Sequence, residues 1–426
     1  MFSQGGLSLE QAPPISVVLR FFVTASIFGV LLGLFLVANS FELISSSQYS
    51  SELVTVHLLS LGIMASFMLG AMFQMLPVLA GVVIKMPTKK AMVAHILLSI
   101  GIFFQIGAFF TTNSILYLIT AILLGSGLLH ASTLMLKELL KIKDHSSSSK
   151  GMIFALSSFI ITIILGVIML LALGGYIDSS YFSQIKELHY SFGLFGWIAL
   201  LIVSISFQVV EMFYVTPKYP DIIAKYFTVT IFVLLLLKII TLFMRWEEAT
   251  INIILSILFI IYAIITIHRL YKRRRPTSDA TVWFWRLGMG LLIVSMIIMI
   301  LNNLFNLDIE IEYFGYFTFA TFILSVIFAM VYKIVPFLVW FHLSNQGYLN
   351  APMMHDIIHP KRAKIHFWIY VAFIVFSIIN IKFYTTTIDI ITGLLITVMF
   401  AWLLYHIVMA VQKYRFVQKN EKKIEW

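Results

Sequence analysis

The chain has 426 residues, of which 61% are hydrophobic and only 11% are charged. A soluble domain usually carries about 25% charged residues, so this composition predicts an integral membrane protein. The absence of cysteine excludes disulfides, thiolate metal sites and cysteine nucleophiles.

Apolar runs of about 20 residues, the length that crosses a bilayer, recur along the whole chain. They predict twelve helices, near residues 15–39, 53–84, 91–111, 114–139, 151–175, 188–215, 222–245, 250–270, 282–305, 312–340, 364–382 and 387–412. The predicted fold class is therefore an all-α integral membrane protein, with residues 1–426 forming a single transmembrane domain.

Lysine and arginine gather in every second connection and in the predicted tail 413–426, whereas acidic residues dominate the other connections. The positive-inside rule then places both termini in the cytoplasm. This topology accounts for the net charge of +10. The same charge could attract the protein to anionic membrane lipid. No nucleic-acid partner is predicted.

The twelve predicted helices divide into three groups of four, at about 15–140, 151–271 and 282–412. The second helix of each group ends alike, with an aromatic, a long polar residue, two apolar residues and then a breaker or a charge. Repeats of this kind indicate how the helices are arranged in space. They predict pseudo-threefold symmetry about an axis along the membrane normal, with the second helices in the middle.

The long polar residues of these three endings are Gln74, Gln208 and Lys333, which predict a polar ring towards the cytoplasmic side. Ionisable groups inside spans often mark pathways, so the ring could admit protons or ions. We favour a structural role, with hydrogen bonds from the two glutamines and Lys333 extended to the lipid headgroups.

His57 and His189 open the first two of these repeat helices, near the outer surface. Polar side chains in the membrane are costly and usually functional, and neutral imidazole is a common heme ligand. The functional interpretation is a heme b held by one or both histidines, with cations for its propionates from Lys238, Arg245, Lys186 and Lys382. The alternative is that both are interfacial residues hydrogen-bonded to Glu52, Glu187 or water.

Two further interpretations involve a metal ion. His57, His189 and a carboxylate of the tenth span, Glu310 or Glu312, would suit zinc, iron or copper if they converge. His57 is also followed at helical spacing by Met64, Met68 and Met75, a stripe that could conduct Cu(I). Methionine is more often an apolar filler. His95, His130 and His406 could form a second site on the inner side.

Twelve helices in three groups of four, with histidine near the outer end of the second, resemble subunit I of the heme-copper oxidases, such as cytochrome c oxidase. The segment HLLSLGIMASFMLGAMFQMLPVLAG is also similar to helices of the NnrS family, which is thought to bind heme. Together with LSLEQAPPISVVLRFFVTASIFG it looks most like bacterial proteins near these families. The resemblance implies a low-spin heme ligand at His57, a copper-ligand position near His189, and a bacterial cytoplasmic membrane.

The chain departs from the oxidase pattern at two places. The region Glu310–Gly315 carries none of the histidines that oxidases place on helix 10, and Phe243–Glu248 lacks their histidine pair after helix 7. A complete oxygen-reducing heme-copper centre is therefore not encoded, and oxidoreductase activity is left open.

We expect a heme-binding, oxidase-like membrane protein that acts in electron transfer or in the response to a small gas (O2 or NO). The alternative is a transporter or channel for a metal ion such as copper or for a small solute. A third interpretation is an assembly factor whose partner is another respiratory or redox membrane subunit.

Overall fold

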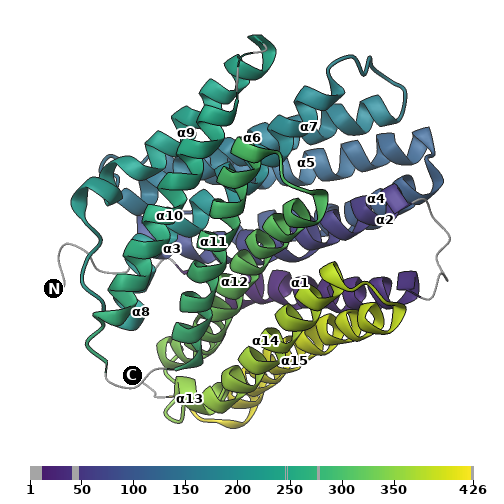
Figure 1. The fold of residues 1–426 in the computed structure, drawn as a ribbon. Helices are drawn as coiled ribbons and strands as arrows, with labels where there is room; N and C mark the ends of the chain where they lie inside the picture. The colour runs from purple at the N-terminus through teal and green to yellow at the C-terminus, as the bar shows by residue number, and fades with distance from the viewer. Residues whose placement is uncertain (1–11, 41–47, 245, 247, 276–278, 424–426) are drawn as a thin grey trace.

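The structure is a computed structural model that describes residues 12–40, 48–244, 246, 248–275 and 279–423 (Figure 1). In this part of the chain, twelve helices are long and apolar enough to cross a membrane, and no strand is formed. The predicted all-α, multi-pass membrane fold is confirmed.

The helices follow one another in three groups of four spans. The first group comprises α1 (Ile15–Ser40), the continuous α2 (Gln48–His57), η2 (Leu58–Ala65) and α3 (Ser66–Ala80), α4 (Pro87–Thr111) and α5 (Ser114–Leu139). The second comprises α6 (Ser147–Leu173), the continuous α7 (Phe182–Ser191), η3 (Phe192–Ala199) and α8 (Leu200–Tyr214), α9 (Asp221–Met244) and α10 (Ala249–Tyr271). The third comprises α11 (Ala280–Phe305), α12 (Ile309–Asn345), the short α13 (Met354–Ile357), α14 (Pro360–Lys382) and α15 (Thr386–Asn420).

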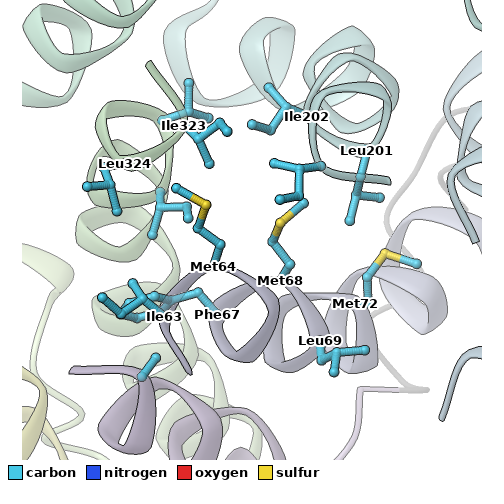
Figure 2. Packing of buried hydrophobic residues seen from close by; sticks show 14 of the residues in the cluster. Ile63, Met64, Phe67, Met68, Leu69, Met72, Leu201, Ile202, Ile323 and Leu324 are labelled. Atoms are coloured by element: carbon cyan, nitrogen blue, oxygen red, sulfur yellow. The ribbon is translucent and has the colours of Figure 1, made fainter. Parts of the chain in front are cut away.

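The second span of each group lies in the middle of the bundle, as the repeat predicted. Along their most apolar stretches, 61%, 78% and 89% of the residues of Ser50–Ala80, Phe182–Tyr214 and Ile309–Asn345 are buried. The corresponding share is 28% to 44% for the other nine spans. Apolar side chains of these three spans meet around the centre, where Met64 and Met68 face Ile202 and Ile323 (Figure 2).

Two of the three central spans change their backbone hydrogen-bond pattern at the same place. The segments η2 and η3 are π-helices of eight residues each. A π-helix closes i→i+5 bonds and so takes more residues per turn than an α-helix; such segments occur frequently at functional sites. η2 begins directly after His57, and η3 begins three residues after His189. The third central span, α12, has no such segment and stays α-helical past Pro336.

The last helix of the chain packs against the first (Figure 1). With the contacts between the other neighbouring helices, this pairing closes the helices into a ring. Glycines let α1 and α15 approach closely. A Cβ added to Gly29 would lie 2.1 Å from the ring of Phe400, and one added to Gly33 would lie 2.7 Å from the carbonyl oxygen of Gly393. No larger residue fits at these two positions without moving a helix.

The segment 413–426, predicted as a cytoplasmic tail, is largely part of a helix. α15 runs on without a break to Asn420, and the Nζ of Lys413 donates to the carbonyl oxygen of Asp356 at 2.6 Å. Residues 424–426 lie outside the described residues.

Candidate functional site

His57 and His189 line the same cavity. It has a volume of about 280 Å³ and is lined by residues of α2, η2, α4 and α5 of the first group and of α6, α7 and η3 of the second. A positive charge on His57 would act on His189 across this cavity. The equivalence of the two helices, inferred from the repeat, therefore brings the two histidines to one place.

Each histidine is held through the same ring nitrogen. The Nδ1 of His57 lies 2.8 Å from the carbonyl oxygen of Leu53, and the Nδ1 of His189 lies 3.0 Å from the carbonyl oxygen of Thr162. Because a carbonyl oxygen only accepts hydrogen bonds, Nδ1 carries the proton in both rings. The Nε2 of each neutral ring then keeps its lone pair, which is the form in which imidazole binds a metal.

Neighbouring groups fix the positions of both rings. The ring of His57 packs on Phe109 with 5.1 Å between ring centroids. Gly166 of α6 lies against His189, so that a Cβ there would be 3.0 Å from the Cε1 atom of the imidazole. Fixed rings with one defined tautomer are typical of metal-ligating histidines, whose other nitrogen usually donates to a carbonyl or carboxylate.

The walls of this histidine cavity are mostly apolar, with few polar exceptions. Gln105 is buried, and its Oε1 has no hydrogen-bond partner among the described residues. The Nε1 of Trp197 is likewise buried without a partner. Lys186, one of the four cations predicted to serve heme propionates, also lines the cavity.

Lys238, another predicted propionate partner, is occupied elsewhere. It is buried, and its Nζ lies 2.9 Å from Glu187, 3.8 Å from Glu248 and 2.9 Å from the Oδ1 of Asn252. Burial and the neighbouring Glu187 raise the pKa of Glu248 to about 7, against the opposing effect of Lys238. Of the remaining predicted cations, Arg245 lies outside the described residues, and Lys382 is exposed and stacks over Phe383.

A second cavity, of about 350 Å³, lies between the second and third groups of helices. It shares Tyr190 and Leu194 with the histidine cavity. Its polar lining consists of Tyr190, Lys238, Asn252, Ser295, Asn302, Asn303, Asn306, Glu312 and Tyr316. This polar cavity contains no histidine among its lining residues.

The predicted metal triad is not assembled. Glu312 lines the polar cavity and accepts a hydrogen bond from the hydroxyl of Tyr316 at 3.2 Å, so it is separated from His57 and His189. Within the described ranges, no three His, Asp or Glu side chains lie where they could share a metal ion. Glu310 is exposed at the start of α12.

The prediction that His57 shares one helical face with Met64, Met68 and Met75 is wrong. His57 lines the lateral cavity, whereas Met68 and Met75 line a small apolar space of about 70 Å³ on the central axis. The physical reason is η2, which lies between His57 and Ser66 and adds residues to each turn. The α-helical spacing used for the prediction therefore does not hold across it.

The predicted polar ring does not form a connected cluster. Gln74 is buried with both side-chain polar atoms unpaired among the described residues. Lys333 does not extend to the headgroups as we had favoured. Its Nζ pairs with Asp279 at 2.5 Å and stacks over Tyr214. Gln208 is partly accessible, and no described hydrogen bond joins it to either of the others.

Comparison with known proteins gives no further guide. No protein-family profile matches this chain, and no curated protein is significantly similar to it. Function must therefore be inferred from the histidines and their surroundings.

His366 of α14 is completely buried and was not singled out from the sequence. No repeat position singles it out. The only available signal was an imidazole within a predicted span, six residues after the Pro360 that opens the helix.

Proposed function

We propose that this protein binds a heme b between His57 and His189 and acts in electron transfer or in the response to a small gas such as O2 or NO. The observation that carries the proposal is the pair of neutral imidazoles on one cavity. Both are bonded through Nδ1 to a backbone carbonyl, which leaves both Nε2 atoms available for iron.

The surroundings suit a largely apolar cofactor with charged edges. The walls are apolar, and Lys186 provides a cation for a propionate. The volume of about 280 Å³ is near the lower end of ligand pockets, roughly 300–1,000 Å³. A porphyrin therefore requires wall side chains to move.

The distribution of charge supports an orientation with both termini in the cytoplasm, and the resemblance to bacterial proteins implies the bacterial cytoplasmic membrane. The histidine cavity then lies towards the outer face. An electron donor, such as another respiratory or redox membrane subunit, would approach there.

The polar cavity favours a second candidate, transport of a small polar solute. Its amides, carboxylate and buried lysine offer both donors and acceptors within about 350 Å³. Copper conduction along the axis has less support, because His57 lines the lateral cavity, whereas Met68 and Met75 line the central space. In the transport reading, uptake would depend on Asn252 and Asn303 and not on His57.

Visible spectra of the detergent-purified protein, oxidised and dithionite-reduced, test the heme proposal. Pyridine hemochrome and metal analysis would be run on the same samples. We expect one heme b per chain, lost in His57→Ala or His189→Ala and retained in His130→Ala, whose histidine is exposed on α5. Colourless protein from a host with ample heme would refute the proposal, and copper without heme would assign the same nitrogens to that metal.

A further inference from the structure

Two buried imidazoles outside the proposed heme site lack hydrogen-bond partners. His366 of α14 is 0% exposed, and neither of its ring nitrogens has a partner among the described residues. His406 of α15 is 6% exposed, and its Nε2 is likewise unpaired. Buried polar groups in native proteins are nearly always paired, so two unpaired imidazoles in one region point to a ligand-binding site.

The packing of α14 against α15 brings the two side chains together. The Nε1 of Trp402 donates to the carbonyl oxygen of Arg362 at 3.2 Å, which fixes the level at which the antiparallel helices meet. His366 lies four residues after Arg362, and His406 lies four residues after Trp402. Because helical side chains lean towards the N-terminus of their own helix, both imidazoles lean back towards this level from opposite sides. A positive charge on His406 would act on His366 at this separation.

Aromatic rings enclose both imidazoles. The ring of His366 packs on Phe328 at 4.6 Å and on Tyr332 at 5.6 Å between centroids, and the ring of His406 packs on Trp402 at 4.8 Å. The surroundings of both rings are therefore mainly aromatic and offer few competing polar groups.

The charge of the surroundings selects the class of ligand. No described carboxylate is paired with either histidine, and the charge acting on His406 is the guanidinium of Arg362. A divalent ion held by two neutral ligands beside a guanidinium would lack compensating charge in a medium of low dielectric constant. A soft monovalent ion needs less compensation, and imidazole is a good ligand for copper.

We propose that His366 and His406 together hold one Cu(I) ion between α14 and α15, enclosed by Phe328, Tyr332 and Trp402. The site is independent of the heme proposal, because it shares no residue with the histidine cavity.

Anaerobic competition for Cu(I) against bathocuproine disulfonate tests the site. The full chain would be used both as wild type and with His57→Ala and His189→Ala combined, so that copper at the first histidine pair is not counted. In the latter background we expect one Cu(I) per chain. His366→Phe or His406→Phe should weaken its binding at least 100-fold, while keeping a ring in each position.

Two further variants separate ligation from packing. His366→Met should retain copper, because a thioether also binds Cu(I). His95→Phe is the matched control, since the Nε2 of His95 is already 2.8 Å from the hydroxyl of Thr24. Cu(I) should also raise the melting temperature of the parent protein and not that of the phenylalanine variants. Equal copper binding in parent and phenylalanine variants, or no copper in the parent, would overturn the proposal, and the second result would assign the unpaired nitrogens to water.

Discussion

The central spans that carry His57 and His189 differ from the third, α12, in two features that occur together. Each of the first two carries a histidine followed by a π-helix. α12 has no π-helix and has the exposed Tyr313 in the corresponding region, and its one histidine, His342, lies in its last turn. The space beside the first two spans is an apolar cavity with two imidazoles. The space beside the second and third is polar and lined by asparagines.

This difference suggests a role for the π-helix. It turns the histidine away from the face that packs on the central axis and towards the lateral cavity. The part of the same span below it, with Met68 and Met75, still packs in the middle. If this span were α-helical throughout, either His57 would point away from the lateral cavity or Met68 and Met75 would point away from the central axis. We infer that the π-helix is what directs the histidine into the lateral cavity.

Inserting one alanine directly after Ser66 should have the largest effect, because it breaks the register that η2 sets between His57 and the lower part of the span. One extra residue in an α-helix rotates His57 by roughly 100° relative to the Met68 face. We expect bound heme to fall at least tenfold, as measured by pyridine hemochrome. Ser60→Ala is the control that keeps the length of the helix, and normal heme content in the insertion variant would contradict the proposed role of η2.

Gly166→Ala should have an intermediate effect, because it disturbs His189 without changing either central helix. The new Cβ would lie 3.0 Å from the Cε1 of His189 and would push the ring off its bond to Thr162. Losing such support for a ligand typically costs 10–100-fold in affinity, and we expect about tenfold faster loss of heme to apomyoglobin. Gly290→Ala, whose Cβ meets no atom within 4 Å, should behave as wild type. Equal rates in the two variants would show that the ring of His189 does not set heme affinity.

The smallest effect is expected from the titration of Glu248, which pairs with Lys238 in the lining of the polar cavity. Its pKa of about 7 exceeds the ordinary value of 4.5, so the folded protein keeps a proton that the unfolded chain loses between these pH values. The free energy of unfolding should therefore fall by roughly 1–3 kcal/mol as pH rises from 4.5 to 7 and stay level above that. Melting temperatures in detergent would show this slope in wild type, and Glu248→Gln should flatten it. An unchanged slope in Glu248→Gln would assign the titration to another group.

Hydropathy and charge were sufficient to predict the twelve spans, because crossing a bilayer imposes a minimum apolar length that a single sequence reveals. The repeat also identified the three central spans. Neighbours in space were harder to predict. The sequence pattern places Lys238 and His189 at a similar depth in the membrane. It does not reveal that Lys238 pairs with Glu187, which depends on the packing of α9 on α7. The π-helices could not be foreseen, since a shift from i→i+4 to i→i+5 bonding leaves no distinct periodicity in eight apolar residues.

The close packing of α1 on α15 has a consequence for how the protein is made. The glycine face of the first helix enters the membrane with its partner, Gly393 and Phe400, still more than 300 residues from synthesis. Until the ribosome has released the last helix, that face is open to lipid or to any helper protein present. Ring closure is thus the final step of biogenesis, and a chain truncated before α15 should be recognised by membrane quality control even though the residues of the histidine cavity are complete.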